Sequence, residues 1–153
     1  EIEKIFTPYY LDHKIKLNCI LYSLNLVKIL TVENQSNLSI YNQLYKLYEI
    51  LKHDDWIKKF IFWELEVIKI VGYDINFNNY IDTSQINKTG SYIRTIDGSK
   101  EIPSFLLKDD DKETNYNELK DGLNIVGDFL NKSVLIPNNI NYPLSRNEFI
   151  KLI

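Results

Sequence analysis

The chain has 153 residues, of which 44% are hydrophobic and 25% are charged, and its formal net charge is −3. These values are typical of one globular domain long enough to bury a core, and no part of the chain has the charge of a polybasic arm. The single cysteine, Cys19, excludes an intrachain disulfide and a cysteine-based zinc cluster, so we expect it to be a small buried hydrophobe.

The longest apolar run, residues 17–30, is too short to span a bilayer and is interrupted by polar residues. We therefore expect a cytoplasmic protein with no membrane partner. The chain contains no methionine. This absence predicts that the chain is not an entire unprocessed translation product and that an N-terminal part is missing.

Hydrophobic spacing predicts three antiparallel helices with short connections in residues 1–73. The first is expected to run from Pro8, which suits a first helical turn, to about Thr31. Its second half is apolar nearly all round, so we expect other helices to enclose it. The second helix carries apolar residues at helical spacing from Ile40 to Leu51.

The third predicted helix, within residues 54–73, is the most apolar and is the one around which the others are expected to pack. Asp54 or Asp55 is placed to cap its first N–H groups. Gly72 stands where a residue with positive φ commonly ends a helix.

Residues 74–107 are predicted to form a small β module, because polar residues break the helical periodicity there. Rough alternation over residues 91–96, followed by the turn pair Asp97-Gly98, predicts a hairpin within a two- or three-stranded sheet. The charge run of residues 108–113 is expected to be a solvated loop. Its three aspartates, residues 109–111, lack the alternating ligand pattern and glycine of a calcium loop.

Residues 108–153 are predicted to form the C-terminal helices. One helix begins near Tyr116 and ends at Pro137, and its two glycines weaken it unless another element approaches closely there. The sequence Ser145-Arg146-Asn147-Glu148 matches a capping box and predicts the start of a last helix. The predicted fold is therefore mainly α, a single domain that is a helical bundle with a small β insertion.

Six short motifs occur along most of the chain, and their order and spacing are more specific than any one of them. They are Trp63-Glu64-Leu65, Val71-Gly72-Tyr73, Lys88-Thr89-Gly90, Pro103-Ser104-Phe105-Leu106-Leu107, Gly122-Leu123 and Pro143-Leu144-Ser145-Arg146-Asn147-Glu148-Phe149. In this arrangement the chain resembles the C-terminal helical domain of the DNA repair and recombination protein RecO, in its variant without zinc.

The resemblance implies a helical domain with a zinc-ribbon-like insertion, preceded by an N-terminal OB-fold that is missing here. It also implies three partners: DNA, bound mainly through the missing OB-fold; RecR; and the acidic C-terminal tail of the single-stranded-DNA-binding protein. Residues 78–102 contain no cysteine and no histidine, so we expect no metal and no cofactor, and packing must hold the insertion together. The long helix from Tyr116 is rich in acidic residues, which argues against strong DNA binding by that surface.

Glu64 interrupts the apolar face of the third helix, and a lone buried carboxylate would be costly. The chain uses 18 Lys and Arg residues, of which only Arg94 and Arg146 are arginines, so these two stand out as sites that need a planar bidentate donor. We expect Glu64 to form a structural ion pair with Arg146 or Arg94. The alternatives are a Glu64 satisfied by other partners and, least favoured, a catalytic acid.

Phe62 interrupts the charged face of the same helix, among Lys58, Lys59 and Lys69. An exposed aromatic ring beside lysines suits an acidic, apolar peptide tail or a stacked base, which makes Lys59, Phe62 and Lys69 candidate partner-binding residues. In the alternative interpretation, neighbouring helices or the missing OB-fold cover the ring. Candidate phosphate contacts are Lys58, Lys59, Lys132 and Lys151.

No catalytic residues are predicted. His13 and His53 are the only side chains with an ordinary pKa near neutrality, and neither stands beside a nucleophile in the sequence. We therefore expect a non-catalytic DNA repair mediator domain that docks partner proteins and supports DNA binding and annealing. The alternative is a helical protein-interaction or structural domain with no nucleic-acid role.

Overall fold

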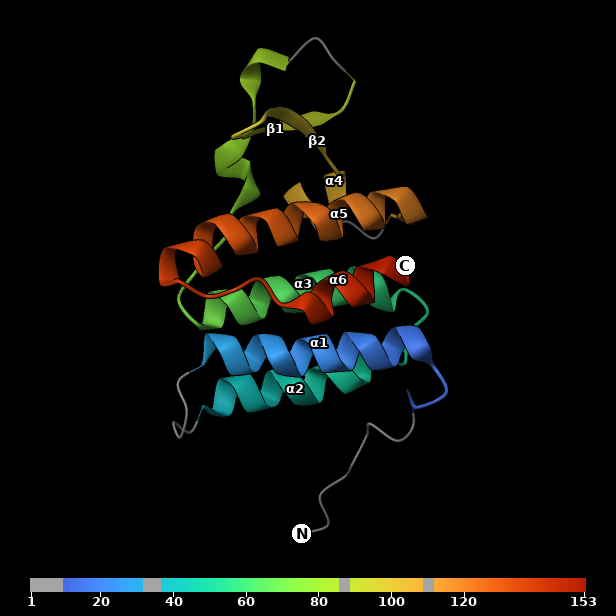
Figure 1. Cartoon of the computed structure of the whole chain (residues 1–153). Helices are drawn as coiled ribbons and strands as arrows, with labels where there is room; N and C mark the ends of the chain where they lie inside the picture. The colour runs from blue at the N-terminus through green and yellow to red at the C-terminus, as the bar shows by residue number, and fades with distance from the viewer. Residues whose placement is uncertain (1–9, 32–36, 86–88, 109–111) are drawn as a thin grey trace.

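A computed structural model of the chain describes residues 10–31, 37–85, 89–108 and 112–153 (Figure 1). The predictions for Pro8, Lys88 and residues 109–111 lie outside the described residues. The fold is mainly helical and carries one small antiparallel sheet, which confirms the predicted class.

The first half forms the three predicted helices: α1 (Lys14–Leu30), α2 (Leu38–Ile50) and α3 (Trp56–Ile70). Helix α1 begins at Lys14, and the described chain just before it, residues 10–13, makes a separate turn. In that turn the His13 N–H donates to the Tyr10 carbonyl at 3.0 Å. Cys19 is fully buried, as expected.

The two ends of α3 differ in how well the sequence predicted them. Gly72 has a φ of +105° just after the helix, which confirms its expected role. Asp55 occupies the N-cap position, but its side chain caps no N–H group. Its carboxylate instead accepts from the Lys59 ammonium at 2.6 Å, so the predicted cap is replaced by an ion pair one turn into the helix.

The insertion begins with two short 3₁₀ turns, η2 (Phe77–Tyr80) and η3 (Thr83–Gln85), and continues as a hairpin of β1 (Ser91–Thr95) and β2 (Gly98–Ile102). The hairpin turn lies one residue earlier than predicted. Thr95 pairs with Gly98, so Ile96 and Asp97 make the turn, and Gly98 opens β2 with a φ of +117° that favours glycine.

A short helix, α4 (Ser104–Leu107), follows the hairpin and packs beside the longer α5 (Tyr116–Phe129). A β-carbon built on Gly122 of α5 would lie 2.6 Å from Cζ of Phe105. The close approach required by the sequence argument therefore exists at this glycine. A capping box that the sequence analysis missed starts α5, with Asn115 and Glu118 each accepting from the other's backbone N–H at 2.9 Å.

After Phe129 the chain continues as a π-helical segment, η4 (Leu130–Leu135), and a 3₁₀ turn, η5 (Ile136–Asn138), so the ordinary α-helix ends well before Pro137. The last helix is α6 (Leu144–Lys151). The capping box predicted at Ser145 is wrong, because α6 already begins one residue earlier and no side chain caps it. The Ser145 hydroxyl instead accepts from the Asn25 amide at 3.1 Å.

Figure 1 shows the helices as layers: α1 and α2 lie side by side at one end, α3 and α6 lie in the middle, and α5 separates them from the hairpin. Aromatic rings from three helices fill the centre. Phe60 of α3 meets Phe149 of α6 edge to face at 5.3 Å, and Tyr22 of α1 stacks against Phe149 at 6.4 Å. The middle layer is therefore the one that the others cover.

Candidate functional site

Glu64 and Arg146 form a bidentate ion pair inside the helical core. The guanidinium donates from Nε to Oε1 of Glu64 at 3.0 Å and from Nη2 to Oε2 at 3.1 Å. The side chains of Arg146 and Glu64 are 1% and 0% exposed. Of the two arginines that the sequence offered as partners, the structure thus pairs Glu64 with Arg146 and ties α3 to α6.

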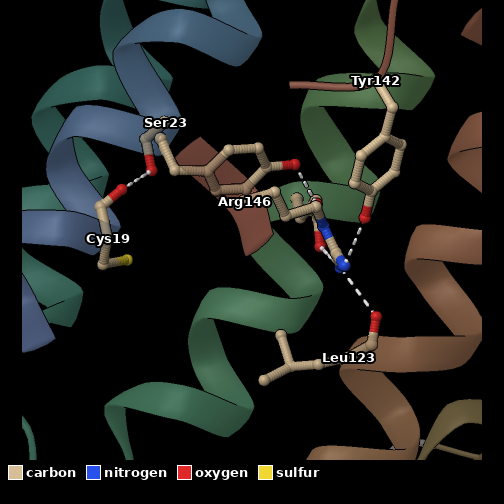
Figure 2. Close-up of polar contacts among 7 residues, drawn as sticks. Cys19, Ser23, Leu123, Tyr142 and Arg146 are labelled. Carbon is tan, nitrogen blue, oxygen red and sulfur yellow. Dashed lines mark hydrogen bonds and ion pairs between the residues drawn. The ribbon is translucent and has the colours of Figure 1, made fainter. Parts of the chain in front are cut away.

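Arg146 donates two further hydrogen bonds (Figure 2). Nη2 donates to the Leu123 carbonyl of α5 at 2.7 Å, and Nη1 donates to the Tyr142 hydroxyl at 3.0 Å. The Tyr22 hydroxyl donates to Oε1 of Glu64 from the opposite side. Four elements therefore meet at one buried polar centre, and each of its groups has a partner.

Gly127 of α5 leaves room for the side chains of Arg146 and Tyr142, because it has no β-carbon. A β-carbon there would lie 2.8 Å from Cζ of Arg146 and 3.0 Å from the Tyr142 hydroxyl. Burial of Arg146 opposes its charge, but the Glu64 carboxylate outweighs that effect and raises the pKa of the guanidinium. Burial, followed by the Glu64 charge, raises the pKa of Tyr22. Each nitrogen of Arg146 and each carboxylate oxygen of Glu64 has a hydrogen-bond partner, which suits a structural role.

Arg94 lies elsewhere, in the β module, where it belongs to a second carboxylate centre. The side chain of Asp82 accepts from Nε of Arg94 at 3.3 Å, from the Ser84 hydroxyl at 2.7 Å, and from the Ser99 hydroxyl. The Ser84 N–H also donates to it, at 3.1 Å. Hydrogen bonds from Ser99 and then Ser84 hold the pKa of Asp82 well below its usual range.

Asp82 thus connects the turn η3 to both strands of the hairpin. From the sequence, packing alone was expected to hold the module together without zinc, and Asp82 was not among the predicted residues. The available signal was the pattern Asp82-Thr83-Ser84, in which an aspartate is placed to accept from the backbone two residues on.

A broad groove of about 1140 Å³ runs along the outer side of α3, between the C-terminal part of α2 and the start of α5. It brings together four of the residues predicted to bind partners or DNA: Lys58, Lys59, Phe62 and Lys69. Phe62 is half-buried, not exposed as the binding interpretation expected, because one side of its ring meets Phe105 edge to face at 6.1 Å. The predicted residues therefore share one surface, with the ring at its base.

The groove carries both signs of charge. Lys59 is paired with Asp55, and Lys58 donates to the Lys112 carbonyl at 3.1 Å. Carboxylates of five further residues also line it: Glu49, Asp54, Glu66, Asp74 and Glu113. This mixture favours a partner that presents apolar surface together with a few charges over a bare phosphate backbone.

The other two predicted phosphate contacts lie apart from this groove. Lys132 stands in η4 near Asp97, with Nζ 3.8 Å from the carboxylate, and Lys151 pairs with Glu148 at 3.0 Å at the end of α6. The four lysines predicted to contact DNA thus form no common surface.

A second cavity, of about 310 Å³, lies between the hairpin and α5 and was not foreseen from the sequence. Its wall includes Ile93, Ile125 and Phe129, and Lys100 and Asp128 stand at its edge with 3.7 Å between the ammonium and the carboxylate. It forms only because the chain folds the hairpin over a helix far away in sequence.

Both histidines are exposed at helix ends: His13 precedes α1, and His53 follows α2 and lines the groove. In the part of the chain that the structure describes, no three side chains of histidine, cysteine, aspartate or glutamate gather as metal ligands would. Within the same residues, no helix has the length and apolarity needed to cross a bilayer.

Comparison of the chain with models of protein families, with curated proteins and with solved structures finds no match.

Proposed function

We propose that this chain is a non-catalytic helical domain of a RecO-like DNA repair mediator, which docks partner proteins and supports DNA binding and annealing. The observation that carries the proposal is the grouping of Phe62 with Lys58, Lys59 and Lys69 along one open groove. The ordered motifs that resemble RecO support it independently.

The groove suits the acidic, apolar C-terminal tail of a single-stranded-DNA-binding protein better than it suits DNA itself. Phe62, Ile57 and Leu65 supply apolar surface for the end of such a tail. Lys69 is exposed and, among the described residues, has no carboxylate within 4.0 Å, so it is available to an acidic side chain of the partner. RecR is the second proposed partner, and DNA contributes mainly through the N-terminal OB-fold that the resemblance implies.

A labelled synthetic peptide with several aspartates followed by an apolar C-terminal end tests the proposal by fluorescence anisotropy. We expect Phe62→Ala to weaken binding by about tenfold or more, since truncating a central aromatic anchor commonly has that effect. Lys69→Glu should also weaken binding. Tyr116→Ala and Lys151→Glu are matched controls, because both residues lie outside the groove. Equal affinities for Phe62→Ala and the unmodified chain would remove the groove as the tail site.

A second candidate is a helical protein-interaction domain with no nucleic-acid role. The pairing of Lys59, Lys132 and Lys151 with acidic side chains favours it, because these lysines are less available to phosphates. Titration of an oligothymidylate at low and at physiological salt separates the two candidates. Salt-sensitive binding supports the mediator, and no binding at low salt supports the interaction domain.

A further inference from the structure

The outer side of α1 carries an apolar stripe that the described part of the domain leaves largely exposed. The sequence predicted that other helices enclose the second half of α1, yet Leu21 and Leu24 are 51% and 42% exposed. With the half-buried Leu17 they recur at spacings of four and three residues, so they share one face of the helix. The prediction of complete enclosure is therefore wrong on this face.

The neighbouring helix has a matching stripe. Leu38, Tyr41 and Tyr45 of α2 recur at spacings of three and four residues, and the two tyrosines are 68% and 50% exposed. The opposite side of α2 faces α3, where the Trp63 indole donates to the Gln43 carbonyl at 2.7 Å. Because α1 and α2 lie side by side as the end layer of the bundle (Figure 1), both exposed stripes belong to that layer.

We call this surface the α1–α2 face and define it by six residues: Leu17, Leu21, Leu24, Leu38, Tyr41 and Tyr45. Isolated exposed apolar residues are ordinary, but several exposed leucines and tyrosines at helical spacing on two adjacent helices are typical of an interaction site.

The charge of the α1–α2 face selects its partner. Lys14 and Lys28 are exposed and stand at the two ends of the leucine stripe of α1, and α1 contains no acidic residue. Among the described residues neither lysine has a carboxylate within 4.0 Å. The one acidic residue of α2, Glu49, is paired with Lys52 at 2.7 Å. The stripe is thus apolar along its length and positive at both ends.

We propose that the α1–α2 face docks an amphipathic helix of a partner protein, one with an apolar stripe and acidic residues near its ends. The distance from Lys14 to Lys28 along α1 is about 21 Å, which corresponds to roughly four turns of a docked helix. Pairs of helices offer such a third helix a ready packing surface, with apolar anchors one and two turns apart.

The same observations disfavour two other occupants. A second copy of this chain would bring lysines toward lysines across a two-fold axis, and like charges oppose that association. Single-stranded nucleic acid binds through aromatic stacking, whereas four of the six side chains of the face are leucines without a ring. This proposal does not depend on the proposed function, because the α1–α2 face and the groove along α3 are separate surfaces.

The test uses two synthetic helical peptides of about 18 residues, each with a leucine stripe, one with glutamates and the other with lysines near both ends. We expect the glutamate peptide to bind the purified chain and the lysine peptide not to bind. The double variant Leu21→Ser, Leu24→Ser should bind the glutamate peptide about tenfold or more weakly than the unmodified chain does, since two apolar anchors are lost. Lys14→Glu with Lys28→Glu should reverse the preference between the two peptides.

Leu144→Ser is the matched control, because Leu144 is an exposed leucine outside the face. All substituted residues are exposed, and circular dichroism melting checks that each variant keeps the fold. The proposal is overturned if neither peptide binds or if the control weakens binding as much as the serine pair. It is also overturned if light scattering shows that the unmodified chain is a dimer and that the Leu21→Ser, Leu24→Ser variant is a monomer. That result would assign the face to a second copy of the chain. The face is assigned to nucleic acid if the Leu21→Ser, Leu24→Ser variant loses oligothymidylate binding and the glutamate peptide does not bind the unmodified chain.

Discussion

The two carboxylate centres of this protein both pair a buried acidic side chain with an arginine, but one arginine is buried and the other is exposed. Glu64 lies in the helical core and accepts from Tyr22 and from the buried Arg146. Asp82 lies in the β module and accepts from two serines and from Arg94, whose side chain is 68% exposed. In both centres one acidic side chain connects segments that are distant in sequence.

The two arginines differ in burial, so the two centres contribute differently to the stability of the fold. In the core, removing one partner leaves a charge without water, so Glu64 and Arg146 depend strongly on each other. In the β module the Asp82 side chain is only 5% exposed, whereas that of Arg94 is 68% exposed. Water can therefore replace the Arg94 guanidinium, and Asp82 acts mainly through its hydrogen bonds from Ser84 and Ser99. A buried ion pair therefore fixes how helices are joined, whereas the exposed one supports a hairpin too small to have its own core.

The largest expected effect is the loss of one member of the buried pair. Glu64→Leu or Arg146→Met should each lower the free energy of unfolding by about 3–5 kcal/mol, because the other charge stays buried alone. The double variant should lose less than the sum of the two single losses. Urea denaturation of the four proteins measures this coupling, and strictly additive losses would show that the two residues do not act as a pair.

Asp82→Asn is expected to have a smaller effect that depends on pH. The folded-state pKa of Asp82 is lowered, so its carboxylate stabilises the fold above the unfolded pKa of about 3.9 and loses that effect as the pH falls further. The variant should therefore be less stable than the unmodified chain at pH 7, with the gap closing below about pH 4. Asp97→Asn, at an exposed turn position, is the control. Urea denaturation at pH 7 and below about pH 4 measures the difference in the free energy of unfolding between the variant and the unmodified chain. A difference that is the same at both pH values would contradict the prediction.

The smallest effect should come from Arg94→Ala. Exposed ion pairs contribute at most about 1 kcal/mol, so the loss should fall within that range and shrink as salt is added. Thermal melts at two salt concentrations, run beside Arg146→Met, compare the same side-chain type in the two surroundings. A loss for Arg94→Ala as large as that for Arg146→Met would end the distinction between the centres.

The sequence predicted the helices well because their apolar residues recur strongly at helical spacing. It also narrowed the partner of Glu64 to two residues, since arginine is scarce and a buried carboxylate needs a bidentate donor. The choice of Arg146 over Arg94 followed only from the fold, which brings α6 against α3 and sends Arg94 to the hairpin.

Local sequence patterns mispredicted the start of a helix where contacts with other parts of the chain decided the local structure. Ser145 and Glu148 have the spacing of a capping box, but α6 already begins at Leu144, and the Ser145 hydroxyl accepts from the Asn25 amide of α1. Asn115 and Glu118 have the corresponding spacing with an asparagine and do form the box. The same pattern can lie at a helix start or just inside it, because the preceding residues fix where the helix begins.

The candidate surfaces were predictable only in part. Lys58, Phe62 and Lys69 share one side of a helix by their spacing alone, so the sequence could group them on the groove. Lys132 and Lys151 were grouped with them by charge, and the fold separates them. The leucines of α1 that are exposed in the structure were predicted to be buried. An apolar sequence shows which residues a helix can bury but not which neighbour covers them.

The sequence by itself determined the helical class, the absence of cysteine ligands in the insertion, and the need for a partner at Glu64, because each follows from residue type and local spacing. Tertiary structure decided that Arg146 meets that need, that Asp82 holds the hairpin, and that one face of α1 stays open. These outcomes depend on contacts between segments far apart in the chain, where many arrangements satisfy the same local pattern and only packing selects among them.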